Sequence, residues 1–421
     1  MLRWLLIPLL FSGASFGKDF AVTDADSLAN AVSLAKPGDN LILREGEWRD
    51  VKIEFSGKGT PTAPIMLKAA NPGKTIISGN STLRIGGEHL VVEGLCFQDP
   101  NTSVSDLIQF RKDSKRLASN CRMTNCSVTS SLAADSVHES RWVGIYGTSN
   151  RVDHCRFQGK SGKGTTFVVW LGNGSEGNHQ IDHNYFGPRE ALGENGGETI
   201  RIGDSKNSML DGKCVVEKNL FEKCNGEAEC ISNKSCANIY RDNSFIEVSG
   251  TITLRHGNRC LVERNVFLGN DARGTGGIRI IGEDHVVSGN YLERLTGDDG
   301  RSAICLMMGI PQSPANRYFQ VQRARIEGNT IVDCKHSILI GLSDDEKSTL
   351  APVETVFIGN QVSSPKVAII EARCDLDGIT WKDNRLSGKS LGIGEVTGIE
   401  ATKPTLTRLI PISRNEVGTS W

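Results

Sequence analysis

Three short motifs between residues 193 and 257 carry side chains that could bind a cation and move a proton. Glu227 and Glu229 stand two residues apart, so on a strand both carboxylates point to the same side. Two carboxylates held that close repel each other unless a cation or a proton intervenes. Asn195 adds a neutral oxygen, and such a set suits a hard cation such as Ca²⁺. A Glu-x-Glu pair alone is more often a solvated surface pair, so the neighbouring residues carry the argument.

Basic residues accompany the acidic pair. Lys234 stands in the phrase Asn-Lys-Ser, and Arg255 and His256 are adjacent. A lysine near a metal ion and an arginine loses its proton more readily and can act as a general base. Alone, each is more often a surface lysine or a salt-bridged pair. Arg201 and Arg279 lie in similar Ile-Arg-Ile phrases, and they could stack as a cationic ladder or hold the carboxylates of a polymer.

A recurring phrase predicts the fold that positions these residues: a few strand residues, then Asn, any residue and an apolar residue. The copies are short, rich in Val, Ile and Phe, and bounded by Gly, Asn and Asp, which is typical of strands. Their spacing of roughly 22 to 39 residues lies within or near the solenoid range. The sequence therefore predicts an all-β, right-handed parallel β-helix (solenoid), with an asparagine ladder at Asn184, Asn219, Asn243, Asn265, Asn290, Asn329, Asn360 and Asn384.

The ladder asparagines also make the coils comparable. Each candidate residue falls 10 to 15 positions after the asparagine of its own coil. Successive coils of a β-helix stack about 4.8 Å apart. We therefore expect these residues to gather on one face, namely Asn195, Glu229, Lys234, Arg255 and Arg279. Segments around Cys155 and Asn125 look like earlier, degenerate copies of the repeat.

One domain and export are expected from the organisation of the chain. The 421 residues contain no Pro/Ser-rich linker and no charge run, which predicts a single β-helix domain over residues 18–421. Residues 1–17 have a basic start, a short apolar run and a small-x-small end, as in a cleavable signal peptide. The apolar run is too short to span a bilayer, so we expect a secreted or periplasmic protein without a membrane partner.

The mature chain is expected to begin with a helical cap. Asp24 or Asp26 can start a short amphipathic helix whose apolar positions would be Leu28, Ala29, Val32 and Ala35. Such a cap covers the open first coil, which otherwise exposes strand edges and apolar core.

Charge and cysteine content restrict the partners. A formal net charge of −1 offers no broad basic face, which argues against nucleic acid. A polyanionic partner would need a local cationic site. The 12 cysteines lie mostly in apolar strand-like runs, where cysteine serves as a small hydrophobe. We expect a monomer with mostly free, stacked thiols and one or two disulfide bridges.

Together the phrases at 195–203, 226–235 and 255–257 resemble the polysaccharide lyase family that contains alginate lyases and chondroitinase B. The likeness covers most of the expected domain, to about residue 360. It implies cleavage of an anionic, uronate-containing polysaccharide by β-elimination with Ca²⁺ as cofactor. It implies Asn195, Glu227 and Glu229 as Ca²⁺ ligands, Lys234 as Brønsted base and Arg255 as acid.

The expected chemistry agrees in outline. Elimination removes the C5 proton of a uronate, and a cation on the adjacent carboxylate offsets its charge while Lys234 takes that proton. Arginine is a poor proton donor in water, so Arg255 is at least a stabiliser of the departing oxygen, with water or His256 as other proton sources. His256 could equally be structural, bonding a neighbouring loop. The expected substrate contacts are Arg201, His256, Arg279, Tyr146 and Tyr318.

Alginate is the expected substrate and dermatan sulfate the alternative. A sulfate-binding site most naturally uses paired arginines. The segment 341–347 is acidic where the chondroitinase branch has adjacent arginines, and the segment 309–321 also resembles the alginate branch.

Two further classes compete with a lyase. A glycoside hydrolase would use paired carboxylates, and Asp298-Asp299 and Asp344-Asp345 are available. Both pairs lie in Gly- or Ser-flanked loops without cationic neighbours in register, so a solvated turn explains them better. A non-catalytic carbohydrate-binding β-helix would share the repeat and the signal peptide but would not need a base beside a metal pair.

Overall fold

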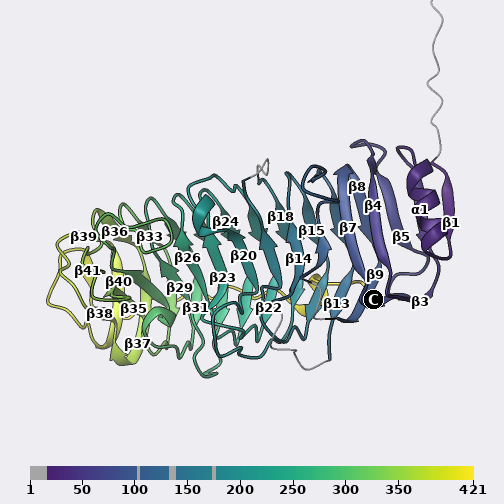
Figure 1. Cartoon of the computed structure of the whole chain (residues 1–421). Helices are drawn as coiled ribbons and strands as arrows, with labels where there is room; N and C mark the ends of the chain where they lie inside the picture. The colour runs from purple at the N-terminus through teal and green to yellow at the C-terminus, as the bar shows by residue number, and fades with distance from the viewer. Residues whose placement is uncertain (1–16, 102–104, 132–138, 173–176) are drawn as a thin grey trace, which may run out of the picture.

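The computed structural model describes residues 17–101, 105–131, 139–172 and 177–421. They wind into an elongated parallel β-helix, which confirms the expected fold (Figure 1). The expected signal peptide falls, apart from Gly17, outside the described residues. No helix in the described part is long and apolar enough to cross a membrane.

Three long parallel sheets form the sides of the solenoid, and most coils contribute one strand to each sheet. Sheet A contains β1 (Asp19–Val22), β2 (Asn40–Leu43), β5 (Ile65–Ala69), β8 (Leu90–Glu93), β12 (Arg122–Thr124), β15 (Arg151–Asp153), β18 (Gln180–Asp182), β21 (Val215–Glu217), β24 (Ile239–Arg241), β27 (Leu261–Glu263), β30 (Val286–Ser288), β33 (Arg325–Glu327), β36 (Thr355–Ile358) and β39 (Ile379–Lys382). Sheet B contains β3 (Gly46–Arg49), β6 (Thr75–Gly79), β9 (Leu95–Pro100), β13 (Ser127–Thr129), β16 (Arg156–Gln158), β19 (Tyr185–Phe186), β22 (Leu220–Glu222), β25 (Ser244–Ile246), β28 (Val266–Leu268), β31 (Tyr291–Glu293), β34 (Thr330–Val332), β37 (Gln361–Ala368), β40 (Asn384–Ser390) and β41 (Ile399–Glu400).

Sheet C carries the candidate site. It contains β4 (Lys52–Lys58), β7 (Thr82–Glu88), β10 (Asp106–Gln109), β11 (Ala118–Ser119), β14 (Arg141–Ile145), β17 (Phe167–Val169), β20 (Ile200–Gly203), β23 (Glu229–Lys234), β26 (Thr251–His256), β29 (Ile278–Ile280), β32 (Ile304–Met307), β35 (Ile338–Leu342) and β38 (Ile370–Ala372). Short 3₁₀ helices lie at Ser205–Asn207, Asp299–Arg301 and Arg414–Glu416.

The helical cap is confirmed as α1 (Ala25–Leu34), with Asp24 as its N-cap. The Asp24 carboxylate accepts a hydrogen bond from the Ser27 amide at 2.8 Å, and the Ser27 hydroxyl accepts one from the Asp24 amide. Leu28 and Ala31 are buried. The expectation for Ala29 is wrong, because Ala31 rather than Ala29 lies one helical turn from Leu28.

The asparagine ladder is confirmed, and all eight side chains are buried. Asn243 shows the pattern: its Oδ1 accepts from the Asn219 amide at 3.0 Å, and its Nδ2 donates to Val216 O at 2.9 Å and Asn265 Oδ1 at 3.0 Å. Toward the N-terminus the ladder continues through cysteine, because the Cys155 amide donates to Asn184 Oδ1 at 2.9 Å. Every coil along the ladder is therefore locked to its neighbour at one corner.

Inside the β-helix, apolar side chains also stack on one another from coil to coil. Phe186, Phe221, Phe245 and Phe267 stack on one another from coil to coil, with ring centroids 4.6 to 4.8 Å apart. All 12 cysteines lie within the described residues and all are free. The expected bridges are therefore absent, and ten of the thiols are buried.

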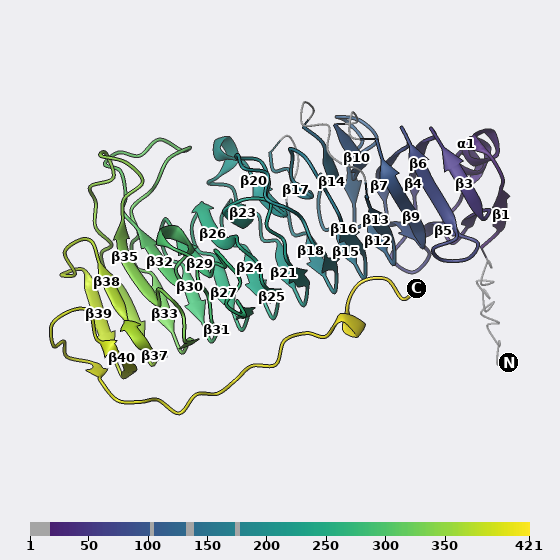
Figure 2. The ribbon, with the colours of Figure 1, turned by 90° about the horizontal axis from the view of Figure 1, so that it is seen from below.

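The C-terminal segment runs back along the outside of sheet B toward the N-terminal coils (Figure 2). Arg414 stacks on the Tyr185 ring at 3.8 Å, and the Gly418 amide donates to His183 O at 2.9 Å. The last residues reach the Asn125 side chain, which accepts from the Ser420 amide at 2.9 Å. This strap spans the coils from β34 to β9, on sheet B rather than on sheet C, which carries the candidate site.

A second ladder, which the sequence analysis did not predict, contains two buried histidines. His179 Nδ1 accepts from the Asn150 amide and His285 Nδ1 from the Cys260 amide, each at 3.1 Å. Burial lowers the pKa of both imidazoles to about 4. Both are therefore neutral in the folded protein at pH 7.

We predict that stability falls on acidification between about pH 6.5 and pH 4. Unfolded histidine has a pKa of about 6.5, so below that pH the unfolded state binds protons that the folded state excludes, and each buried histidine costs about 2 kcal/mol by pH 5. Urea unfolding at pH 8 and pH 5 measures this. In His179→Asn, a neutral amide takes the place of the imidazole, as Asn150 and Asn238 do at the equivalent positions of other coils. The loss of unfolding free energy between pH 8 and pH 5 should then be smaller by the contribution of one histidine. An unchanged dependence would contradict this prediction.

Candidate functional site

A cavity of about 740 Å³ opens on the outer face of sheet C, over β23, β26 and β29. It gathers most of the residues that the sequence singled out: Asn195, Glu227, Glu229, Lys234, Arg255, His256, Arg279 and Tyr318. Arg201 and Tyr146 do not line it. Arg201 lies on β20, and Tyr146 follows β14, three strands away from β23 in sheet C.

A β-bulge at Cys230 turns Glu229 toward the cavity. Glu229 pairs with Thr251 and Ile231 with Ile252, so Cys230 is an extra residue in β23. Cys230 and Ile231 both face the core. Strict alternation would have put Glu229 on the inner face with Ile231, and the bulge reverses this. Glu227 lies before β23 begins. The two carboxylates therefore do not reach the cavity through alternation along one strand, which was the reason expected from their spacing.

A second bulge lies in the neighbouring strand. Asn233 pairs with Leu254 and Lys234 with His256, which leaves Arg255 as the extra residue of β26. Because of the bulge, Arg255 and His256 both line the cavity although they are adjacent in sequence. Bulges are common beside active sites, where they redirect side chains.

The Glu227 carboxylate sits on a glycine turn. Its Oε2 accepts from the Gly196 amide at 2.7 Å and the Gly197 amide at 3.1 Å. A Cβ on Gly197 would stand 2.4 Å from Gly226 O, so only glycine allows the two loops to approach. Burial, Glu198 and Glu229 nevertheless raise the pKa of Glu227 to about 7.

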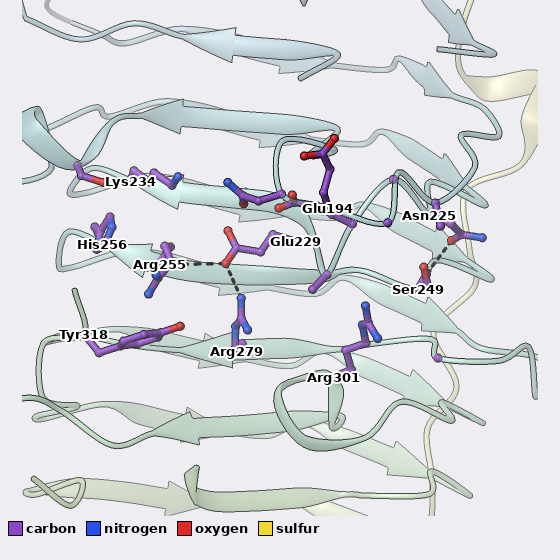
Figure 3. A pocket seen from close by; sticks show the side chains of 18 of the residues that line it. Glu194, Asn225, Glu229, Lys234, Ser249, Arg255, His256, Arg279, Arg301 and Tyr318 are labelled. Carbon is purple, nitrogen blue, oxygen red and sulfur yellow. Dashed lines mark hydrogen bonds and ion pairs between the residues drawn. The ribbon is translucent and has the colours of Figure 1, made fainter. Parts of the chain in front are cut away.

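Glu229 lies between two arginines (Figure 3). It forms an ion pair with Arg279, and Arg255 Nε lies 3.7 Å from its Oε1. The Ser232 hydroxyl donates to Oε2 at 2.5 Å. Burial opposes ionisation, but Arg279, Ser232 and Arg255 together keep the pKa of Glu229 below its usual value. Glu229 is therefore ionised at neutral pH.

The two arginines at Ile-Arg-Ile phrases do not form a ladder. Ser232 and Thr253 stand between Arg201 and Arg279 in the same column of sheet C. Arg279 instead holds the Glu229 carboxylate of this chain.

A loop from residue 309 to residue 321 closes the cavity on its C-terminal side. The Tyr318 ring packs on the Arg255 guanidinium at 4.0 Å. Arg317 beside it pairs with Asp344 at 3.3 Å and with Asp345. The Asp345 carboxylate also accepts from the Lys347 amide at 2.9 Å. The acidic segment therefore anchors the loop that carries Tyr318.

His256 contacts the same loop through the backbone of Arg317. Burial, Arg255 and Lys234 lower the pKa of His256 to about 3. The imidazole is thus neutral at pH 7 and is not a cationic proton donor, which favours the structural interpretation of this residue.

The aspartate pairs considered for a hydrolase have cationic partners, so that expectation is wrong. Asp298 pairs with Lys335 and lies 3.1 Å from His336, and Asp344 and Asp345 pair with Arg317. These cationic partners lie on neighbouring coils, and the residue spacing within one coil does not reveal contacts between coils. Neither aspartate pair is among the described residues that line the cavity.

The cavity also contains residues that the sequence analysis missed, namely Glu194, Arg273, Arg301 and Asn316. Arg301 ends the 3₁₀ helix after the Asp298-Asp299 turn, and its Nε is buried without a hydrogen-bond partner in the described part of the chain. In the sequence, Arg301 is marked only by the neighbouring Asp298-Asp299 turn, which was interpreted as a solvated turn.

The oxygen-rich side of the cavity fits a hard cation. The donors are the Asn195 amide and two carboxylates, Glu227 and Glu229, whose mutual repulsion a cation would relieve. Beside them, Glu198 is 2% exposed and its Oε2 has no hydrogen-bond partner in the described chain. In the described residues, no three His, Cys, Asp or Glu side chains converge on one point, so the amide and substrate oxygens would complete any such site.

Comparisons with known proteins agree with this geometry. The sequence profile of the chondroitinase B family matches residues 22–417. The structure of the PL6 family alginate lyase AlyGC is 41% identical with a TM-score of 0.92, and the match covers 96% of this chain but 58% of AlyGC. This chain thus spans little more than half of that relative's length. No curated protein matches the sequence.

Two further structures match over nearly their full lengths. A mannuronic acid specific polysaccharide family 6 lyase from human gut microbiota is 32% identical with a TM-score of 0.84, covering 96% of each chain. The PL6 family polysaccharide lyase Pedsa3628 from Pseudopedobacter saltans is 27% identical with a TM-score of 0.77, covering 96% of this chain and 99% of that one.

We predict that Arg317→Ala loosens the loop at 309–321, because the ion pairs with Asp344 and Asp345 anchor it. Amide hydrogen exchange of this loop should become faster while exchange in β23 and β26 stays slow. Arg325→Ala is the matched control, since Arg325 pairs with Glu327 on sheet A. Equal exchange of the loop in both variants would show that the acidic segment does not anchor it.

Proposed function

The chain belongs to the chondroitinase B family, and we propose that it is a lyase that cleaves alginate by β-elimination. The observation that carries the proposal is the convergence of Glu227, Glu229, Lys234 and Arg255 in one cavity. These residues come from two neighbouring coils, and the two bulges turn Glu229 and Arg255 outward. The alginate lyase activity named for AlyGC, which is 41% identical, supports the same reaction class.

Lys234 is the proposed base. It faces the cavity beside Glu229 and Arg255, where the C5 hydrogen of a bound uronate would lie within reach. Lys234 takes that proton as the C4–O bond breaks, which leaves a double bond between C4 and C5. A β-elimination therefore adds no water to the product, in contrast to a hydrolase.

Arg255 is the proposed stabiliser of the departing oxygen. Tyr318 on one side and Glu229 on the other hold its guanidinium in place, so its charge is oriented before substrate arrives. Because His256 is neutral, water is the proton source that remains for the leaving group.

Asn195, Glu227 and Glu229 would hold Ca²⁺, and a bound Ca²⁺ would offset the charge of the uronate carboxylate and so acidify the C5 hydrogen. Arg279 and Arg255 also compensate the charge of Glu229.

Alginate is preferred over dermatan sulfate on the charge of the loops around the cavity. A sulfate-binding site most naturally uses paired arginines, which bind sulfate in a bidentate manner. At the acidic segment, Asp344 and Asp345 engage the nearby Arg317, which leaves it unavailable for sulfate. We also propose export, because residues 1–17 have the pattern of a cleavable signal peptide.

The proposal predicts a Ca²⁺-dependent increase in ultraviolet absorbance on alginate, from the C4–C5 double bond of the product. The purified protein is incubated with alginate and, separately, with dermatan sulfate, with Ca²⁺ or with chelator. Activity that persists in chelator would exclude the cation role. A signal on dermatan sulfate alone would keep the mechanism and change the substrate. Shortened chains without absorbance would indicate a hydrolase.

Lys234→Ala should lower kcat by roughly 10²- to 10⁴-fold, the usual contribution of a general base. The fold should be retained, because Lys234 ends β23 and points outward into the cavity. Lys382→Ala is the control, since Lys382 is an exposed lysine at the end of β39. Full activity in Lys234→Ala would remove this lysine from the mechanism.

A further inference from the structure

A column of outward-facing residues leads from the cavity toward the N-terminal coils of sheet C. Gly203 on β20 pairs with Lys234 on β23. Val169 pairs with both Ile145 and Ile202, so the following residues, Tyr146, Trp170 and Gly203, align in the same column. Trp170 therefore lies two coils from Lys234, and the residue between them has no side chain.

The two rings of this column form one aromatic surface. Tyr146 and Trp170 are stacked at 18° with centroids 6.2 Å apart. Gly144 lies beside them, and a Cβ there would stand 3.2 Å from Tyr146 and 3.8 Å from Trp170 Nε1. The Asp106 carboxylate is the third near neighbour at this position, with its Oδ2 3.8 Å from the same Cβ and 3.5 Å from the Tyr146 hydroxyl.

Arginines surround the aromatic surface. Arg111 packs on Tyr146 at 3.8 Å, and Arg201 packs on Trp170 at 5.0 Å. Arg141 also faces Trp170 but is already paired with Asp106 and Glu139. No acidic side chain of the described residues lies within ion-pair distance of Arg111 or Arg201. Two guanidinium groups therefore have charge available for an anionic ligand.

Two buried donors in this region also have no partner. Trp170 Nε1 and Arg201 Nε are enclosed and form no hydrogen bond with the described residues. A buried donor without a partner costs free energy, and an acceptor oxygen reaches these two donors only if the surrounding side chains move.

The opposite side of the cavity is covered. Cys305 and Leu339 continue the column of Arg279 on β32 and β35, and both are buried. The loop at 309–321 seats Tyr318 and Ile310 on them in a small apolar cluster. A polymer that leaves the cavity along sheet C is therefore directed toward β20 and β17.

We propose that Trp170, Arg111 and Arg201 form a second binding site for uronate residues, two to four sugar units from the bond that is cleaved. The inference rests on the proposed function, and it adds where the rest of the chain lies. One coil advances by about 4.8 Å, close to the length of one sugar unit in a 1,4-linked chain. Tyr146 and Trp170 hold the Arg111 and Arg201 guanidinium groups in place, and the two arginines pair with uronate carboxylates.

The test compares Trp170→Ala and Arg111→Ala with wild type on uronate oligomers of three and six units. A hexasaccharide reaches the second site and a trisaccharide mainly occupies the cavity. The ratio of kcat/KM for the hexasaccharide to that for the trisaccharide should fall about tenfold in each variant. Arg385→Ala, which removes an exposed arginine of sheet B, should keep the wild-type ratio. Thermal unfolding checks that each variant is folded.

Binding of the hexasaccharide in chelator, measured by calorimetry, separates the two proposals. Weaker binding in Arg111→Ala and Trp170→Ala than in Arg385→Ala supports the second site even if no oligomer is cleaved, an outcome that would overturn only the lyase assignment. Unchanged hexasaccharide binding and an unchanged kcat/KM ratio in both variants would overturn the second site while leaving the lyase intact.

Discussion

The asparagine ladder is the interaction on which the rest of the structure depends. Each ladder amide accepts from the backbone of one coil and donates to the next, inside the helix where water cannot compete. The ladder fixes the register of the coils from Asn184 to Asn384 at one corner, so residues 20 to 50 positions apart can meet on sheet C. Arg279 and Glu229, separated by 50 residues, are ion-paired for this reason.

The site departs from this regularity at two points. A perfectly regular helix would alternate side chains inward and outward along every strand. The bulges at Cys230 and Arg255 break the alternation, and they turn Glu229, Arg255 and His256 outward together. The surrounding ladders hold the backbone on both sides of each bulge. A rigid scaffold with local irregularities therefore presents a dense group of charges without making the whole coil irregular.

Charge compensation lowers the free-energy cost of burying these charged side chains when the protein folds. Glu229 is buried but has Arg279, Arg255 and Ser232 as partners, whereas Glu227 depends on two glycine amides and is hard to ionise. Charge compensation also holds the loop over the cavity, because Asp344 and Asp345 bind Arg317 next to Tyr318. Arg111 and Arg201 are exceptions, with aromatic rings as their neighbours and no acidic partner in the described chain.

The sequence by itself determined the parallel β-helix, the ladder and the helical cap, because each depends on a local pattern that repeats or on a capping residue next to its helix. It also brought Asn195, Glu227, Glu229, Lys234, Arg255, His256, Arg279 and Tyr318 forward as one group. Only the tertiary structure decided the bulges, the ion pairs of Glu229 and Arg317, the histidine ladder and the place of Tyr146 and Arg201 outside the cavity. These features depend on which side chain of one coil lies beside which side chain of the next. Coil lengths vary with the loops, so that alignment is set by stacking in space.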